Sequence, residues 1–238
     1  MLYPNEISCV NCNFCNVKDD SIFSVLRQEE LDELQNNRSH IIFDAGELIF
    51  KERQRPSGIY ILLEGKVKLS KYGFEGKEHI VRFSKKGDIL GYRALLGDES
   101  YSCSAIAITE TQLCFLPKET LNHILQKNTE LAFAFMKWLA NDLRIAEEKS
   151  IRMAQKPVRE RIAESLLLLV GVYGFESDKI TLNISMKRDE LAGISGTTRE
   201  TATRVLSDFS SEGYIDMDKR KIRVKDMNGL QRIANQSF

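Results

Sequence analysis

The sequence has few of the residues on which enzyme chemistry most often depends. Only three histidines occur among 238 residues, and they are scattered at His40, His79 and His123. No pair of carboxylates, no nucleophile beside a base and no histidine-rich helix can be recognised. An enzyme carrying a regulatory domain would need such a set of residues, so a catalytic function is not expected.

An excess of charge is absent as well. The chain carries 34 Lys and Arg against 34 Asp and Glu, so its formal net charge is zero. This balance argues against a protein that coats nucleic acid by bulk electrostatic attraction. From Lys156 onward there are 14 basic and 12 acidic residues, a net charge of +2, which leaves −2 for the preceding part. Any affinity for DNA must therefore come from the placement of individual charges.

Long apolar runs are also missing. The longest, Leu166 to Val170, is far too short to span a bilayer and is typical of a buried helix. Residues 1–8 lack the basic segment followed by an apolar one that marks a signal peptide. We therefore expect a cytoplasmic protein with no membrane partner. Five cysteines in such a reducing compartment favour metal or redox chemistry over structural disulfides.

The patterns that are present predict an α+β fold. Residues 40–117 contain many short alternating segments separated by glycine-containing turns, which is typical of a β-sandwich or jelly-roll barrel. Helices are expected at residues 28–36, 118–126, 129–154 and 158–173. The long third helix should end at Gln155-Lys156-Pro157, because proline breaks a helix and makes a natural hinge.

Apolar residues in the long helix recur at alternating steps of three and four. Over about two and a half heptads this spacing forms a coiled-coil seam suited to a two-fold partner. The seam comprises Met136, Leu139, Leu143, Ala146, Ser150 and Met153. Phe133, Phe135 and Trp138 offer an inner face that can pack on the protein's own barrel, so both roles can hold. Because Ser150 is the only polar member of the seam, we expect a homodimer that forms without an effector.

Two short helices joined by a tight turn are predicted within residues 186–209. Ser185 is expected to cap the first helix, and Gly193 to take the positive φ that ends it. Thr197 is expected to cap the second helix, with Glu200 three residues later as in a capping box. Four apolar residues form one stripe on the second helix: Ala202, Val205, Leu206 and Phe209. This layout is typical of a helix-turn-helix, whose second helix enters the major groove of DNA.

The opposite face of the second helix carries side chains suited to reading DNA. Arginine donates two hydrogen bonds to guanine, glutamate accepts one from cytosine, and threonine contacts a thymine methyl group or a phosphate. Strands expected at residues 214–216 and 221–224 would form a wing with basic residues near the phosphates. The predicted DNA-binding residues are Thr198, Arg199, Glu200, Thr203, Arg204, Lys219 and Arg220. The alternative is a ligand- or redox-binding module in which this helical hairpin is only structural.

The order of barrel, seam helix, hinge and winged helix-turn-helix resembles the CRP/FNR superfamily of bacterial transcription regulators. The segments that carry the resemblance are DAGELIF from Asp44, GIYILLEGKVKL from Gly58, GDILG from Gly87, KPVRERIAESL from Lys156 and GTTRETATRVL from Gly196. It places Arg199, Glu200 and Arg204 at base-reading positions, with Thr203 at a further contact position. It also implies a homodimer that binds a near-palindromic operator in double-stranded DNA and contacts RNA polymerase.

On this resemblance the chain divides into four parts. Residues 1–20 are a cysteine-rich segment, and residues 21–127 a jelly-roll sensor domain of the cyclic-nucleotide-binding type. Residues 128–155 are the dimerisation helix and hinge. Residues 156–238 are the winged helix-turn-helix DNA-binding domain.

The effector site is where the sequence departs from the superfamily pattern. Cyclic-nucleotide binders of the superfamily carry Gly-Glu-Leu and, further along, Arg-Ser/Thr, which hold the ribose and the cyclic phosphate. Here Tyr92 stands at the Glu position, and Ser102 or Cys103 at the Arg position. Because burying a phosphate without its cation is unfavourable, cAMP is not expected. The residues of the expected effector pocket are Gly91, Tyr92, Arg93, Ser102, Cys103 and Ser104.

Another branch of the superfamily senses oxygen or redox state through an iron–sulfur cluster bound by three N-terminal cysteines and one cysteine in the barrel. The spacing of Cys9, Cys12 and Cys15 is compatible with a [4Fe–4S] cluster, although it is tighter than the superfamily's usual third spacing. Cys114 aligns with the barrel ligand. Four thiolates could equally bind a structural zinc ion, and a regulator that binds a small molecule or nucleotide without a metal is the remaining alternative.

Overall fold

The computed structural model describes residues 6–7, 22–73 and 76–235. The chain divides into two compact units. The first comprises Met1–Leu69 and Phe83–Ile145, and the second comprises Ser70–Arg82 and Ala146–Phe238. The long helix α4 (Thr129–Gln155) contributes residues to both units, which are described separately below.

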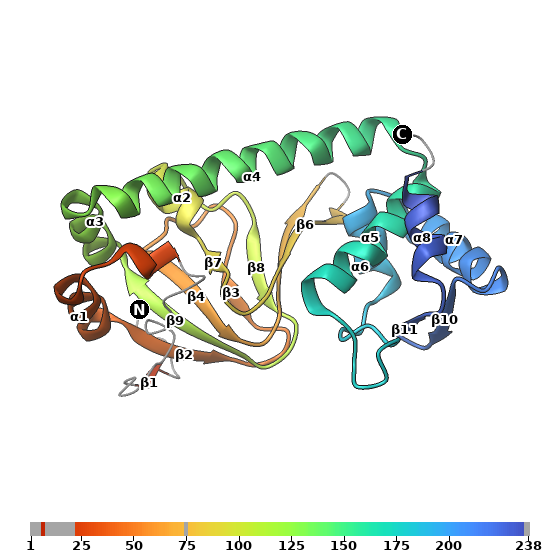
Figure 1. Ribbon diagram of the computed structural model, residues 1–238, viewed down its shortest axis with the longest axis horizontal. Coiled ribbons are helices and arrows are strands. Elements are labelled where there is room, and N and C mark those ends of the chain that lie inside the picture. The colour runs from red at the N-terminus through yellow and green to blue at the C-terminus, as the bar shows by residue number, and fades with distance from the viewer. Residues whose placement is uncertain (1–5, 8–21, 74–75, 236–238) are drawn as a thin grey trace. The chain divides into compact units, whose positions relative to one another are not determined.

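Nine short strands are found in the described residues up to Pro117, and all of them except the end of β5 and most of β6 belong to the first unit (Figure 1). They are β1 (Glu6–Ile7), β2 (Ser39–Phe43), β3 (Leu48–Phe50), β4 (Gly58–Glu64), β5 (Val67–Tyr72), β6 (Glu78–Ser84), β7 (Ile89–Leu90), β8 (Ser104–Ala107) and β9 (Thr111–Pro117). One sheet has the order β1-β2-β9-β4-β7, and the other has the order β3-β8-β5-β6. The turn between β4 and β5 requires Gly65, whose φ is +98° and where a Cβ atom would lie 2.5 Å from the carbonyl oxygen of Glu110. The predicted barrel of short, turn-linked strands is confirmed.

Strand β9 shows how the sequence alternation builds the core on both faces of the sheet. It pairs with β2 and β4 in antiparallel fashion, so that Leu113 lies opposite Ile41 and Phe115 opposite Tyr60. Leu113 belongs to the cluster between the two sheets, and Phe115 packs against it. The intervening Cys114 belongs to a second cluster on the other face. Successive side chains of a strand point to opposite faces, so this division follows from the strand itself.

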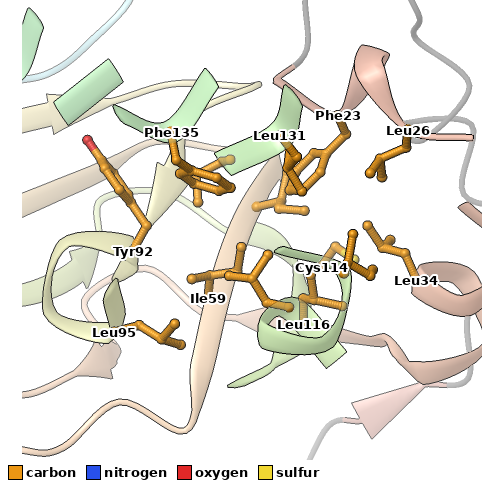
Figure 2. Packing of buried hydrophobic residues seen from close by; sticks show 14 of the residues in the cluster. Phe23, Leu26, Leu34, Ile59, Tyr92, Leu95, Cys114, Leu116, Leu131 and Phe135 are labelled. Atoms are coloured by element: carbon orange, nitrogen blue, oxygen red, sulfur yellow. The ribbon is translucent and has the colours of Figure 1, made fainter. Parts of the chain in front are cut away.

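Helices cover the second face of that sheet. They are α1 (Gln28–Asn37), α2 (Tyr92–Leu96), α3 (Lys118–Lys127) and the N-terminal part of α4, together with a 3₁₀ turn at Ile22–Val25. Figure 2 shows Leu34, Leu131 and Phe135 of these helices packed around Ile59 and Leu116 of the sheet. Leu34 and Leu131 are fully buried, and burial of each such side chain contributes about 1.5–3 kcal/mol.

The second unit is mainly helical. It contains α5 (Val158–Tyr173), α6 (Arg188–Ser195), α7 (Arg199–Ser211), β10 (Ile215–Asp218), β11 (Lys221–Val224) and α8 (Met227–Ala234). Its core is formed by fully buried residues that include Leu166, Leu206, Phe209, Ile222 and Leu230. The helices predicted at 28–36, 118–126, 129–154 and 158–173 each match an observed helix to within one residue at either end. Among the described residues, no helix is both long enough and apolar enough to cross a membrane.

Candidate DNA-binding surface and sensor site

The first helix of the predicted pair begins at Arg188, as the sequence predicts, but different residues cap it and end it. Lys187, not Ser185, is the N-cap of α6, and its backbone N–H donates to the carboxylate of Glu190 at 2.9 Å. Gly193 lies inside the helix and is buried, so its predicted role as the helix terminator is wrong. Gly196 ends the helix with a φ of +61°, and its N–H donates to the carbonyl of Ala192. A left-handed residue at this position closes a helix because it turns the chain away from the axis.

The second helix also begins one residue later than predicted. Thr198, not Thr197, is the N-cap of α7, and its hydroxyl oxygen accepts a hydrogen bond from the N–H of Thr201 at 3.3 Å. Thr197 lies in the turn after α6, where its N–H donates to the carbonyl of Ala192 at 3.0 Å. The turn between the two helices is therefore short, and both of its ends are capped.

Helix α7 has one buried face and one exposed face, as the apolar spacing predicted. Ala202, Val205, Leu206 and Phe209 are buried in the second unit. The five residues predicted to read DNA from this helix are all exposed: Thr198, Arg199, Glu200, Thr203 and Arg204. Packing of the apolar stripe thus orients the polar face outward without any use of the polar side chains.

The charged groups on this face remain available to a partner. Arg199 forms only a long ion pair with Asp189, 3.6 Å between nitrogen and oxygen, and both side chains are about 60% exposed. Such an exposed pair contributes about 0–1 kcal/mol and is readily exchanged. The pKa of Glu200 lies below its ordinary value because its carboxylate is hydrogen-bonded first by its own backbone N–H and then by the Thr198 hydroxyl. Glu200 is therefore an anion at neutral pH and can only accept hydrogen bonds.

The first strand of the wing begins one residue later and ends two residues later than expected, and the second strand lies where it was expected. β10 runs from Ile215 to Asp218 and pairs with β11 so that Asp218 lies opposite Lys221. Lys219 and Arg220 form the two-residue turn and are both exposed, and Lys219 adopts a φ of +53°. A two-residue hairpin turn commonly requires such a positive φ because its twist matches that of the strands. The carbonyl of Arg220 accepts from the N–H of Met186, which ties the wing to the segment before α6.

One residue that positions this surface had no signal in the sequence. Arg161 of α5 donates from Nε to the carbonyl of Ser195 (3.0 Å) and from Nη2 to that of Gly196 (3.2 Å). Its Nη1 donates to the carbonyls of Met153 (3.0 Å) and Lys156 (3.1 Å). The guanidinium thus joins the C-terminal ends of α4 and α6, where a cation is favoured by the helix dipoles. It fixes the turn from which α7 begins.

In the first unit, two of the predicted effector residues contact α4. Tyr92 is buried, its hydroxyl donates to the carboxylate of Asp142, and its ring stacks on Trp138 with centroids 5.5 Å apart. Arg93 donates to the same carboxylate oxygen from Nε (2.9 Å) and Nη2 (2.7 Å). Figure 2 shows the ring of Tyr92 beside that of Phe135 of α4, and their centroids are 6.2 Å apart. These side chains join the short helix α2 to the long helix.

The remaining predicted effector residues lie around the cluster between the sheets. Gly91, with a φ of +85°, is the N-cap of α2. Ser102 is exposed, and Cys103 is buried in the cluster. The Ser104 hydroxyl accepts from the N–H of Glu52 at 3.0 Å. The cluster interior contains the rings of Phe50, Tyr60 and Tyr101.

Of the predicted metal ligands, only Cys114 falls within the described residues. Cys9, Cys12 and Cys15 lie outside them. Cys114 is 2% exposed and lies among Leu34, Ile59 and Leu116, on the face of the sheet that α1 and the turn at Ile22–Val25 cover (Figure 2). In the part of the chain that the structure describes, no three His, Cys, Asp or Glu side chains are grouped so that they could bind a metal ion.

The predicted seam of α4 is largely exposed on the single chain. Met136 is 52% and Leu143 is 61% exposed, Ala146 and Ser150 are also exposed, while Leu139 and Met153 are half-buried. Phe135 and Trp138 pack on the core as expected. The expectation that Phe133 shares this inner face is wrong, since it is 61% exposed. Residues two apart lie on opposite sides of a helix, so Phe133 and Phe135 cannot face the same way.

Comparison with known proteins agrees with this architecture. Residues 40–128 match the family model of the cyclic nucleotide-binding domain, and residues 160–233 match that of the Crp-like helix-turn-helix domain. The anaerobic regulatory protein of Bacillus subtilis is 28% identical, with 87% of each chain covered. The cyclic AMP receptor protein of Thermus thermophilus is 26% identical, with 92% of this chain and 98% of the relative covered.

A solved structure extends the likeness. The CRP/FNR-family transcriptional regulator TTHA1359 of Thermus thermophilus is 30% identical, with a TM-score of 0.68, and the match covers 82% of this chain and 97% of that chain. That structure is of a transcriptional regulator, in agreement with the expectation that the protein is not an enzyme. The chain belongs to the CRP/FNR family of transcription regulators.

Proposed function

We propose that this regulator reads the bases of its operator directly through Arg199, Glu200 and Arg204 of α7. Thr198 and Thr203 would add contacts on the same face, and Lys219 and Arg220 of the wing would contact phosphates. The observation that carries the proposal is the division of α7 into a buried apolar stripe and an exposed face that holds all five of the helix's predicted contact residues. Because the net charge of the chain is zero, the chain has no general attraction for DNA. DNA binding must therefore depend on the positions of these exposed side chains.

We further propose that two copies pair along the exposed seam of α4. Large apolar side chains such as Met136 and Leu143 are unfavourable in water and would be buried by a second copy of the helix. Two recognition helices would then reach successive major grooves, with half-site centres about 34 Å apart on a near-palindrome. RNA polymerase is the partner expected for a dimer bound beside a promoter.

Base and phosphate contacts can be separated by experiment. The operator would be selected from a pool of random duplexes, and binding of variants followed by fluorescence anisotropy at several salt concentrations. Arg204→Ala should cost about 1–3 kcal/mol and relax the preference at one base pair in each half-site. Lys219→Ala should weaken binding to all sequences similarly and lower the salt dependence by about one phosphate contact.

Arg232→Ala provides a matched control, because this arginine is an exposed residue of α8 in the same unit. It should leave affinity and sequence preference near those of the parent protein. If Arg199→Ala and Arg204→Ala both retain the parent's affinity and base preference, direct readout through α7 is wrong.

For the signal, we propose a [4Fe–4S] cluster bound by Cys9, Cys12, Cys15 and Cys114. The donor set fits such a group, because thiolates are the usual ligands of iron–sulfur clusters. Phe23 and Leu26 lie shortly after the cysteine-rich segment. Both are buried in the same part of the hydrophobic core as Cys114. Seven Cα–Cα steps lead from Cys15 to Ile22 and span at most about 25 Å, so the N-terminal thiols can reach this face. When bound, the cluster would supply a redox-sensitive group, and the apolar side chains around Cys114 would limit access of water.

Anaerobic purification followed by a visible absorption spectrum and analysis of iron, sulfide and zinc tests this proposal. The parent protein should contain about four iron and four sulfide per chain. Cys114→Ala should lose the cluster, whereas Cys103→Ala, which changes a buried thiol in the other core cluster, should retain it. Zinc without iron would favour a structural zinc site instead. Absence of both metals would favour a regulator that responds to a ligand alone.

A further inference from the structure

A cavity of about 340 Å³ opens between the β3–β4 loop and the segment that follows α2. Its floor consists of buried aromatic rings, and its rim consists of exposed polar side chains. Floor and rim are formed by Phe50, Tyr60 and Tyr101, and by Gln54, Arg55 and Ser57, respectively. None of these residues belongs to the effector pocket predicted from the superfamily pattern. The volume is within the range typical of small-molecule sites.

The floor of this cavity favours a planar ligand. The ring of Phe50 stacks on that of Tyr101 with centroids 3.9 Å apart and an angle of 16° between the planes. Tyr60 lies beside this pair, 6.0 Å from Phe50. An aromatic ligand can extend such an array through offset stacking or edge contacts, at the ring separations that aromatic pairs prefer.

The rim provides a positive charge that the protein uses only weakly, as a counter-charge to Asp98 after Lys118. Arg55 is exposed and, among the described residues, neither donates a hydrogen bond nor forms an ion pair. The nearby carboxylate of Asp98 is instead bound by Lys118 at 2.9 Å. A guanidinium presents two parallel donors that match a carboxylate or a phosphate.

The walls of the cavity are joined by backbone hydrogen bonds. The N–H of Arg53 donates to the carbonyl of Tyr101 (2.8 Å), and the N–H of Tyr101 donates to the carbonyl of Gln54 (2.9 Å). Arg53 is held at a φ of +70°, which a side-chain-bearing residue rarely adopts. These bonds set the loop that carries Arg55 against the aromatic floor.

We propose that this cavity binds a small aromatic anion, with its ring on the Phe50–Tyr101 stack and its carboxylate or phosphate on Arg55. A bound ligand could influence α4 through Tyr101 and Gly91. The Tyr101 ring packs against Gly91, so closely that a Cβ atom added to Gly91 would lie 3.2 Å from the ring. Gly91 caps the helix α2, which holds Asp142 of α4. The effect on DNA binding rests on the proposed role of α4 in the dimer, whereas the binding itself does not.

Calorimetric titration of the full-length protein tests the site with benzoate and phenyl phosphate as probes and benzamide as the neutral analogue. At least one anion should bind with a Kd of about 1 mM or lower, and benzamide should bind at least about tenfold more weakly. Comparison of the two anions distinguishes a carboxylate site from a phosphate site. Arg55→Gln should weaken the anion about tenfold, with Arg55→Lys between the two.

Lys51→Gln is the matched control, since it removes one exposed charge from the same loop without touching the cavity. It should change the affinity by less than about twofold. The proposal is overturned if neither anion binds with a Kd below about 10 mM, if benzamide binds equally well, or if Arg55→Gln matches the parent. Operator binding without a probe checks the proposed function separately. An unchanged operator affinity at saturating probe would refute the coupling to α4.

Discussion

Replacement of Arg161 tests whether the turn before α7 is held by a single side chain. The guanidinium donates four hydrogen bonds of 3.0–3.2 Å to carbonyls at the ends of α4 and α6. Hydrogen bonds to charged groups contribute about 1.5–3 kcal/mol when well shielded, and about 0.5–1 kcal/mol each is appropriate for this half-exposed site. Arg161→Met, which removes all four bonds, should therefore destabilise the second unit by about 2–4 kcal/mol.

Arg161→Lys separates charge from geometry. Lysine keeps a cation near the two helix ends, worth about 0.3–1 kcal/mol, but its single nitrogen cannot reach all four carbonyls. We expect a loss of about 1–2 kcal/mol in stability. If about 1 kcal/mol of this loss must be recovered to order the turn that presents Arg199 when DNA binds, operator affinity should fall about fivefold. The base preference should not change.

Unfolding by urea should be followed in two ways. The only tryptophan, Trp138, lies in the first unit, so its fluorescence reports on that unit, while circular dichroism reports on both. The Arg161 variants should shift the circular dichroism transition and leave the Trp138 transition in place. Arg159→Lys is the control, because Arg159 lies two residues away and makes one ion pair with Glu212. The reasoning fails if Arg161→Lys costs no more than Arg159→Lys, or if only the Trp138 transition moves.

Three further substitutions test other parts of the structure. Asp142→Asn should lower the stability reported by tryptophan fluorescence by about 1–2 kcal/mol, because it weakens the link between α2 and α4. Lys156→Met should cost about 2–4 kcal/mol, since it leaves a carboxylate and a carbonyl without their donor; the double variant with Glu164→Leu should recover part of this loss in urea unfolding. Burial acts to raise the pKa of Glu30, but hydrogen bonds from a backbone N–H and from Asn128 outweigh it, so the pKa is lowered. The stability that Glu30 contributes is therefore present above the ordinary glutamate pKa and lost as the pH falls through the lowered one. Glu30→Gln should reduce the loss of stability seen as the pH is lowered below about 4.5.

The bounds of the helices were predictable because apolar periodicity extends over many residues. Individual caps were not, as the segment from Ile194 to Thr198 shows. It offers serine, glycine and two threonines in succession, and local rules allow several of them to end or begin a helix. Arg161 selects among them, because it binds the carbonyls of Ser195 and Gly196. That choice depends on a residue more than thirty positions away and cannot be deduced from the segment itself.

The same limit applies to the candidate sites. The exposed face of α7 could be predicted, since it is the complement of a four-residue apolar stripe. The orientation of the Tyr92 side chain could not be predicted, because its partner Asp142 lies fifty positions later on another helix. The cavity beside Arg55 also had no sequence signal, since its floor and rim come from three separate segments.

The position of Tyr92 bears on how this protein can receive a signal. In the superfamily pattern this residue would be the acid that holds a ribose hydroxyl, yet here its hydroxyl is bound to Asp142 and its ring to Trp138. Arg93, the nearest cation to the missing phosphate partner, is bound to the same carboxylate. Both side chains would have to release α4 before they could contact a nucleotide, and the hydrogen bonds lost would oppose binding. We therefore infer that α2 serves here to hold the long helix.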